Sequence, residues 1–192
     1  FSLIYVTGDM HGDIMRFKDP EIKKIKKGDT LIVCGDFGFI WDNSKKEKSI
    51  LKKLAEKDFT IAFIDGCHEN FDLLERYDVV EWNGGKAHII EHNIIHLMRG
   101  QVYNIEDKNI FTFGGGQTYD EEWRRSMGTV WKQEMPEMEE IEEGIENLKE
   151  NGNEVDFIVT HEPPLKVKNF LNLNDPNEFR VSALNAYFEE LS

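Results

Sequence analysis

Four short apolar segments of this chain each end in side chains that can bind a metal ion or move a proton. The segments and the clusters that follow them are residues 3–6 with Asp9-Met10-His11, residues 30–34 with Gly35-Asp36, residues 59–64 with Asp65-Gly66-Cys67-His68-Glu69, and residues 155–159 with Thr160-His161. Uninterrupted apolar runs of this length are typical of buried strands. Since α/β proteins place their chemistry beyond the carboxyl ends of parallel strands, we expect the clusters to share one crevice.

The pattern between these strands predicts an α/β protein with a single domain over residues 1–192. Strand, helix, strand repetition indicates a sheet with crossover helices. Short apolar runs that lie closer together indicate antiparallel hairpins, as a second sheet or as an extension of the first. The expected helices cover 18–27, with turns at Pro20 and Gly28-Asp29, then 44–57, a short stretch through Leu73-Leu74, 136–150 and 180–191. The expected hairpin strands cover 87–90, 93–97, 101–105 and 109–113.

Residues 117–135 show no clear periodicity, and we expect a long loop or lid there that takes part in substrate selection. Arg124 and Arg125 lie in this segment and are candidates for binding a substrate phosphate. An ion pair with one of the many carboxylates is the alternative for each, and Arg99 has the same two alternatives.

The histidines and cysteines outside the clusters have simpler interpretations. His88, His92 and His96 fall in the hairpin region, where a strand or surface histidine is commoner than a metal ligand. Cys34 belongs to a buried-strand pattern and is expected to be a small core residue. With Cys67 as the second cysteine, the chain has no disulfide framework of the secreted kind.

The formal net charge of -14 argues against non-specific binding to nucleic acid, which needs clustered lysines and arginines. An anionic substrate would therefore need a local source of positive charge, and divalent metals would supply it. No segment approaches the ~20 apolar residues of a membrane span, and the first residues predict a strand instead of a signal sequence. We expect a cytoplasmic protein with no membrane partner.

In their order, the four clusters resemble the motifs of the calcineurin-like metallophosphoesterase superfamily, in its bacterial single-domain form. The superfamily motifs are Asp-x-His, Gly-Asp, Gly-Asn-His-Asp/Glu, a His near a Thr or Gly, and finally Gly-His-x-His. The first four are matched here by Asp9-Met10-His11, Gly35-Asp36, Gly66-Cys67-His68-Glu69 and Thr160-His161. The resemblance covers nearly the whole chain.

The resemblance implies two packed mixed β-sheets flanked by helices, a four-layer αββα sandwich, with two metals at the strand ends. Asp9 and His11 would hold the first metal, Asp36 would bridge both, and His161 would hold the second. His68 would donate to a phosphate oxygen or to the leaving group, so Asp36 and His68 are the expected catalytic residues. A shared carboxylate suits two metals that together stabilise an in-line displacement.

The implied activity is hydrolysis of a phosphate monoester or diester by a metal-bound hydroxide. The substrate would be a phosphorylated small molecule, a nucleotide or a phosphoprotein. We expect manganese, iron or zinc at the two sites, with manganese preferred. The Asp-Arg-Gly of the protein Ser/Thr phosphatase branch is absent, since Phe37-Gly38-Phe39 follows Asp36, and this makes a phosphatase of that branch the less favoured assignment.

Two departures from the motifs leave an alternative open. Cys67 stands where the superfamily has an Asn that binds the second metal, so the thiol would either shift the preference toward zinc or impair the site. No Gly-His-x-His follows His161, and we expect the natural protein to continue past Ser192 with the C-terminal part of this domain. The alternative function is thus a catalytically impaired or non-catalytic binding or regulatory module. A nucleotide switch or a dehydrogenase is disfavoured, because the chain has neither a Walker motif nor Gly-x-Gly-x-x-Gly after its first strand.

Overall fold

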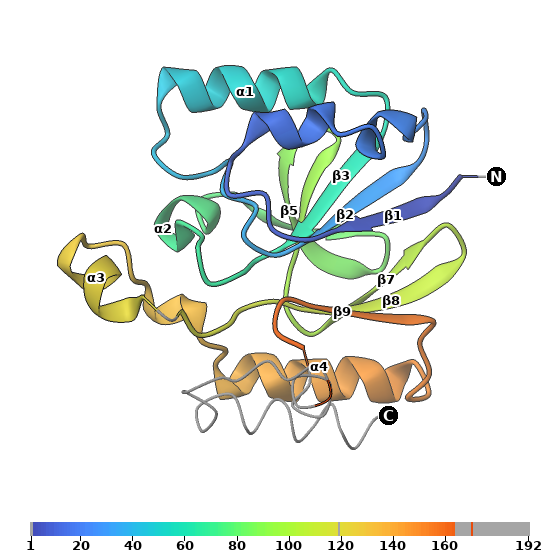
Figure 1. Cartoon of the computed structure of the whole chain (residues 1–192). Coiled ribbons are helices and arrows are strands. Elements are labelled where there is room, and N and C mark those ends of the chain that lie inside the picture. Colours follow the sequence, from blue (N-terminus) through green and yellow to red (C-terminus); the bar gives the residue numbers. More distant parts are fainter. Residues whose placement is uncertain (1, 119, 164–169, 171–192) are drawn as a thin grey trace.

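The computed structural model describes residues 2–118, 120–163 and 170, and these residues form two β-sheets that are packed face to face between helices (Figure 1). The expected helix over 180–191 lies outside the described residues. The six-stranded sheet has the order β1-β2-β3-β6-β5-β4 and the three-stranded sheet the order β7-β8-β9. The strands are β1 Ile4–Thr7, β2 Thr30–Cys34, β3 Thr60–Ile64, β4 Val79–Trp82, β5 Gly85–Glu91, β6 Ile94–Leu97, β7 Gln101–Ile105, β8 Lys108–Phe113 and β9 Phe157–Thr160.

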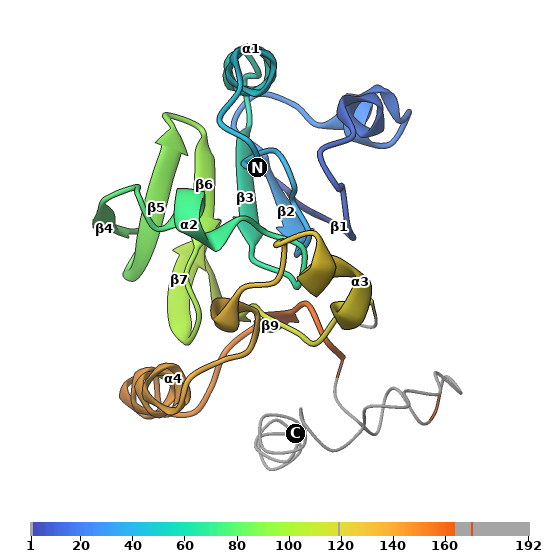
Figure 2. The same cartoon turned by 90° about the vertical axis from the view of Figure 1, so that its left-hand side faces the viewer.

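The helices are α1 Lys45–Ala55, α2 Phe71–Leu74, α3 Glu121–Ser126 and α4 Met138–Glu150, with short 3-10 helices at Ile14–Lys18, Ile22–Lys24 and Lys132–Glu134. Helix α1 lies over the outer face of the larger sheet and α4 over that of the smaller sheet, whereas α3 projects from one end of the sandwich (Figure 1 and Figure 2). Leu51 and Leu54 of α1 pack on one face of the larger sheet, and Leu148 of α4 packs on the smaller sheet. These layers confirm the expected αββα sandwich.

Successive side chains of a strand point to opposite faces of the sheet, and those on one face form the core between the two sheets. Ile32 faces the smaller sheet, whereas its neighbours Leu31 and Val33 face the α1 side. Ala62 and Ile64 of β3 join Ile32 in the central layer, opposite side chains from β7, β8 and β9. The central strands β2 and β3 are therefore buried on both faces, which explains why their sequences are unbroken apolar runs.

Parallel pairing places the strand ends together. β1, β2, β3 and β6 run parallel, so the segments that follow β1, β2 and β3 leave the sheet at the same edge. In the smaller sheet β9 runs parallel to β8, with Thr160 beside Phe113. The cluster after β9 thus leaves the second sheet next to the glycines that follow β8.

The hairpins resolve an alternative left open by the sequence. β4, β5 and β6 extend the first sheet by antiparallel pairing of β4 with β5 and of β5 with β6, while β7 and β8 form a hairpin of the second sheet. The hairpin strands thus both extend the first sheet and contribute two strands to the second one. β4 had not been expected, and β9 ends at Thr160, one residue later than predicted.

Two expectations for helices and loops were wrong in detail. The helix expected over 18–27 is replaced by the 3-10 helices, because Pro20 disfavours a helical Asp19 and the Asp19 carboxylate accepts the backbone N–H of Glu21. The segment 117–135, expected as a loop, contains α3 and a 3-10 helix. The helix expected over 136–150 is confirmed as α4, which begins at Met138.

Among the described residues, no helix combines the length and the apolar character that crossing a membrane would need.

Candidate metal centre

Backbone hydrogen bonds join the first two motif loops. The backbone N–H groups of Met10 and His11 both donate to the carbonyl oxygen of Asp36, at 3.0 and 2.8 Å, and Gly12 donates to Phe37 at 3.0 Å. His11 and Asp36 adopt left-handed backbone conformations, with φ of 47° and 48°. Such conformations are uncommon for residues other than glycine and are concentrated at functional sites. The two loops therefore present Asp9, His11 and Asp36 from one rigid unit.

Two glycines of the motifs make room for candidate ligands. Gly35 has a φ of +98°, and a Cβ atom there would overlap the ring of His161. A Cβ atom at Gly66 would overlap the carboxylate of Asp36. The glycines in Gly35-Asp36 and Gly66-Cys67-His68 are thus required by close packing of the candidate ligands, beyond any role in a turn.

Asp36 lies at the centre of the site. Its Oδ2 atom is 3.7 Å from Nε2 of His11, and its Oδ1 atom is 3.7 Å from Nε2 of His161. Asp9 is at the rim, with Oδ2 3.6 Å from Nε2 of His11 and Oδ1 3.9 Å from Nδ1 of His161. Sγ of Cys67 is 3.8 Å from Nε2 of His161.

Two groups of potential ligands overlap in this arrangement. His11, Asp36 and His68 form one group, and Asp36, Cys67 and His161 form the other. Within each group the ligand atoms lie within 4.8 Å of one another. Asp36 belongs to both groups, which is the position that a bridging carboxylate would need. Imidazole, carboxylate and thiol groups are suitable ligands for divalent transition metals, so the chemistry of this donor set fits such ions.

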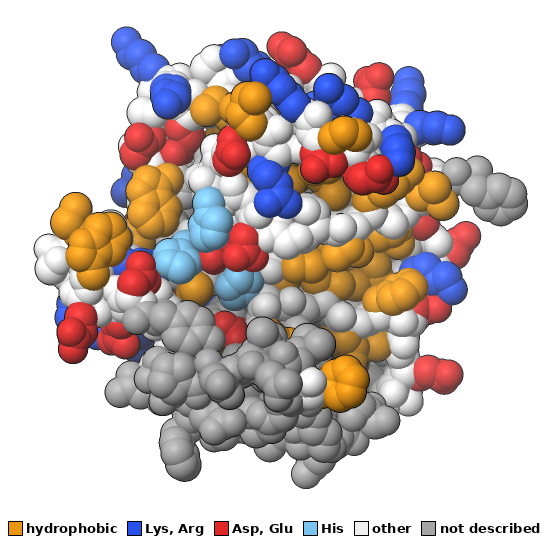
Figure 3. All heavy atoms as spheres, viewed as in Figure 1, with side chains coloured by type: hydrophobic (Ala, Val, Ile, Leu, Met, Phe, Trp, Pro, Cys, Tyr) orange, Lys and Arg blue, Asp and Glu red, His pale blue; other side chains and the backbone are white. Residues whose placement is uncertain are grey.

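The site has a buried floor and an open mouth. The Asp36 side chain is 3% exposed, whereas those of Asp9 and His11 are 47% and 55% exposed. Histidine and acidic side chains accordingly appear together on one face of the molecule (Figure 3). A substrate could therefore reach the rim from solvent, while the floor is shielded and its electrostatic interactions are strengthened.

His68 is the most strongly engaged imidazole of the site. Its Nδ1 atom is 2.8 Å from Oδ2 of Asp36, its backbone N–H donates to Oδ1 of the same carboxylate at 2.8 Å, and its Nε2 atom is 3.5 Å from Oδ1 of Asp120. The hydrogen bond to Asp36 raises the pKa of His68 above its ordinary value. Burial raises the pKa of Asp36, but the hydrogen bond from His68 and the charge of His161 outweigh burial, and the net pKa is lowered.

Asp120 was missed by the sequence analysis. Its only sequence signal was its place in the segment 117–135, which had been assigned to substrate selection as a whole. The structure brings its carboxylate from the start of α3 to the far nitrogen of His68.

Cys67 and Glu69 flank His68 with different roles. Burial, followed by the charge of Asp36, raises the pKa of the Cys67 thiol, so the thiol is neutral near pH 7. Its Sγ atom lies 3.3 Å from Nδ1 of His68. The buried carboxyl group of Glu69 accepts the backbone N–H groups of Phe37 and Gly38 at 2.7 and 3.3 Å. Glu69 thereby holds the loop that follows Asp36, and burial raises its pKa to about 8.

The three arginines considered from the sequence all form ion pairs. Arg124 is buried and pairs with Glu134 at 2.7 Å, and the exposed Arg125 pairs with Glu121. Arg99 is likewise buried and pairs with a carboxylate. Of the two alternatives considered from the sequence, each arginine thus forms an ion pair. Binding of a substrate phosphate by Arg124 or Arg125 stays a prediction.

The remaining histidines lie away from both groups of ligands. His88 and His96 are on β5 and β6, as expected for strand histidines, and His92 is exposed in the turn between them. His88 and His96 are buried and form contacts of their own.

Comparison with protein families agrees with the order of the motifs. A family model described as calcineurin-like phosphoesterase matches residues 2–187. No curated protein and no solved structure matches the chain.

Proposed function

Because the chain belongs to the calcineurin-like phosphoesterase family, we propose that it hydrolyses a phosphate monoester or diester at two divalent metal ions held around Asp36. The family implies metal-dependent hydrolysis of phosphate esters. The observation that carries the two-metal assignment is the membership of Asp36 in both groups of potential ligands.

The proposed ligand sets follow from the distances in the site. Asp9, His11 and Asp36 would hold one ion, since both carboxylates lie 3.6–3.7 Å from Nε2 of His11. In this set Asp9 takes the place of His68, which belongs to the same group but is kept for proton transfer. Asp36, Cys67 and His161 would hold the other ion. Two bound ions supply an activated water nucleophile and neutralise the charge of the phosphate. Manganese is the proposed metal, and zinc is the alternative that a thiol ligand would favour.

His68 is the proposed proton donor to the departing alcohol. Its Nδ1 atom is engaged by Asp36, which leaves Nε2 to donate to the leaving oxygen. The Asp120 carboxylate lies 3.5 Å from that nitrogen, and its charge would stabilise the protonated form of the ring. The proposed substrate is a phosphorylated small molecule, a nucleotide or a phosphoprotein, and the proposed domain covers residues 1–192.

Hydrolysis of an aryl phosphate monoester and diester, measured with added manganese and with a chelator, tests this function. We expect turnover that the chelator abolishes, and the ratio of the two rates will narrow the substrate class. Failure of protein with two bound metal ions to hydrolyse either ester would contradict the proposal.

Asp36→Asn tests the bridging role directly. We expect the variant to bind less manganese and to lose at least ~100-fold in kcat/KM, because an amide cannot provide two anionic oxygens to two ions. Metal content would be measured by elemental analysis. Asp72→Asn is the matched control, since Asp72 is an exposed carboxylate of α2 outside both groups, and it should retain metal and activity. An unchanged metal content in Asp36→Asn would show that Asp36 is not the bridge.

A second candidate function, an impaired or non-catalytic module, is favoured by Cys67 in the second group of ligands, because a thiol must lose its proton to bind a metal ion. Here Cys67→Asn is informative, because an amide oxygen binds manganese without having to lose a proton. If the thiol limits the site, manganese-dependent turnover should rise by about tenfold or more, the size of a typical effect at a metal site. Loss of activity in Cys67→Asn would instead identify the thiol as a working ligand.

A further inference from the structure

A pocket of about 410 Å³ opens directly beside the candidate metal centre. His11 and His68 form the side of the pocket next to the metal ligands, and Phe39, Trp41 and Ile50 are its large apolar side chains. Ligand pockets commonly enclose about 300–1,000 Å³ and are lined mainly by apolar and aromatic side chains. The pocket is therefore large enough for the organic part of a phosphate ester whose phosphate lies at the metals.

Trp41 is held in place before any ligand binds. Its backbone N–H donates to Glu47 at 2.6 Å, and its carbonyl oxygen accepts the side-chain amide of Asn70 at 2.6 Å. Trp131 packs edge to face against the indole ring, with the ring centroids 5.7 Å apart. A ring fixed in this way loses little conformational entropy when a ligand packs on it.

The charged groups of the pocket do not favour a particular ionic ligand. The Glu47 carboxylate is occupied by the backbone N–H groups of Trp41, Asp42 and Asn43, at 2.6, 2.8 and 3.1 Å. Lys46 and Asp42 are exposed and of opposite charge. Apolar and aromatic contacts are thus the main source of selectivity in this pocket.

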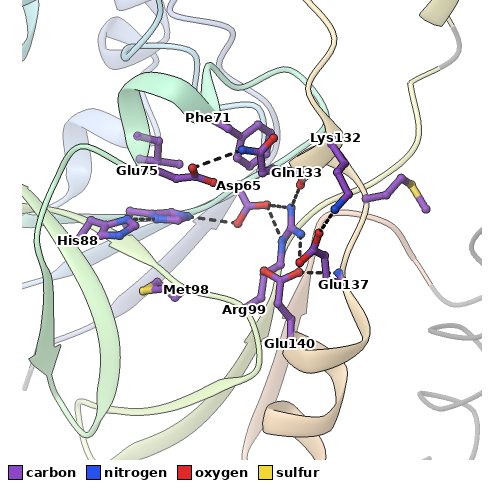
Figure 4. A pocket seen from close by; sticks show the side chains of 13 residues that line it. Asp65, Phe71, Glu75, His88, Met98, Arg99, Lys132, Gln133, Glu137 and Glu140 are labelled. Carbon is purple, nitrogen blue, oxygen red and sulfur yellow. Dashed lines mark hydrogen bonds and ion pairs between the residues drawn. The ribbon is translucent and has the colours of Figure 1, made fainter.

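A second cavity, also of about 410 Å³, is less suited to binding the organic part of a substrate. It is lined by Asp65, His96, Arg99 and Lys132 among others, and none of its lining residues belongs to either group of potential metal ligands described above (Figure 4). Its charged side chains pair with one another, Arg99 with Asp65 and Lys132 with Glu137.

We propose that the pocket beside the metal centre binds the alcohol part of the substrate and selects a flat aromatic or heteroaromatic ring that lies against Trp41. This inference rests on the proposed function, because it assumes that the phosphate is bound at the metals. Trp41 determines specificity in this scheme and takes no part in bond cleavage. Flat rings gain from contact with an indole face because of its quadrupole and its large rigid surface.

Binding of two phosphonates to the manganese-loaded protein tests the inference without requiring turnover. Benzylphosphonate and cyclohexylmethylphosphonate have the same number of carbon atoms and the same anionic group, and they differ in the flatness and π-electrons of the ring. By calorimetry we expect the wild-type protein to bind benzylphosphonate about tenfold more tightly, in line with stacking of one ring on an aromatic side chain.

Variants assign the preference to Trp41. Trp41→Ala should reduce the ratio of the two affinities to within about twofold, and Trp41→Phe should retain most of it, since phenylalanine keeps an aromatic face. Trp123→Ala is the matched control, because Trp123 is 64% exposed on α3 and does not line the pocket. Its ratio should equal that of the wild type.

The outcomes separate this inference from the proposed function. Equal affinities for the two phosphonates in the wild-type protein, or a preference that survives in a folded Trp41→Ala, would overturn the aromatic pocket alone. Absence of binding of either phosphonate to metal-loaded protein would count against the proposed function and the pocket together. The affinities of the wild-type protein for the two phosphonates test the preference for an aromatic ring even if Trp41→Ala fails to fold.

Discussion

At the scale of residues, a buried chain of side chains runs from His88 through His96 to Asp65. Nε2 of His96 is 3.2 Å from Oδ1 of Asp65, and the Nδ1 atoms of the two histidines are 3.0 Å apart. Since the carboxylate can only accept, we assign the proton to Nε2 of His96, and its Nδ1 then accepts from Nδ1–H of His88. Burial is the main cause that lowers the pKa of His88, to about 4.

This lowered pKa predicts a loss of stability in mild acid. The unfolded chain takes up a proton on His88 as the pH falls through 6.5, whereas the folded protein does so only near pH 4. The free energy of unfolding should therefore fall as the pH drops from 6.5 to 4, by up to about 3 kcal/mol from this residue. Urea unfolding at several pH values measures the effect.

Two variants isolate the contribution of His88 from that of the many carboxylates. His88→Gln should flatten the pH dependence between 6.5 and 4 relative to the wild type. His92→Gln, on the exposed turn, should leave it unchanged. Identical curves for His88→Gln and the wild type would show that His88 is not the titrating group.

At the scale of elements, Arg99 connects the end of β3 to the segment around α4 (Figure 4). It follows β6 and donates to Asp65 from Nε at 2.9 Å and from Nη2 at 2.6 Å. The same guanidinium reaches Glu140 of α4 at 3.0 Å and the carbonyl oxygen of Gln133 at 2.6 Å. Asp65 directly precedes Gly66-Cys67-His68, so this contact braces the loop that carries two candidate site residues.

Arg99→Met is expected to be strongly destabilising. It would leave the buried Asp65 carboxylate without its main counter-ion, and breaking a buried pair from one side costs about 3–5 kcal/mol. Lys86→Met is the control, since the Lys86–Glu143 pair is exposed and such pairs contribute about 0–1 kcal/mol. Denaturant unfolding measures the free energy of unfolding of both variants. The double variant Asp65→Asn/Arg99→Met should recover part of the loss, and no recovery would contradict the charge explanation.

At the scale of the whole molecule, the candidate ligands come from both sheets. Asp9, Asp36 and Cys67 follow strands of the larger sheet, and His161 follows β9 of the smaller one. The Nδ1 atom of His161 already reaches across to the carbonyl oxygen of Cys34 at 2.9 Å. A metal held by His161 and Asp36 would tie the two sheets together at their carboxyl edges.

Metal binding should therefore stabilise the entire fold. At a free manganese concentration of 100 times Kd, the gain is about 2.7 kcal/mol, which corresponds to an increase in Tm of roughly 5–10 °C for a protein of this size. Thermal unfolding with and without manganese measures the shift, and a chelator should reverse it. The shift should be much smaller in Asp36→Asn. An equal shift in that variant would mean that the stabilising ions bind elsewhere.

The sequence alone determined the features that residues close together in the chain encode. Apolar runs predicted the central strands, and the motif beside each run predicted which side chains would leave the sheet together. The sandwich and the family followed from the order of those motifs. The helix expected over 18–27 is only a short 3-10 helix, because the Asp19 carboxylate accepts the backbone N–H of Glu21 and strengthens the turn expected at Pro20.

What only the tertiary structure decided are the contacts between residues far apart in the chain. His68 meets Asp120, Trp41 meets Trp131 and Asp65 meets Arg99 only after the two sheets and the segment 117–135 have packed. No local pattern encodes such partners, because their proximity depends on sheet order, register and helix packing at once. The candidate metal ligands could be named from the sequence because each follows a strand, whereas the groups that contact them and shape the pocket depend on long-range packing.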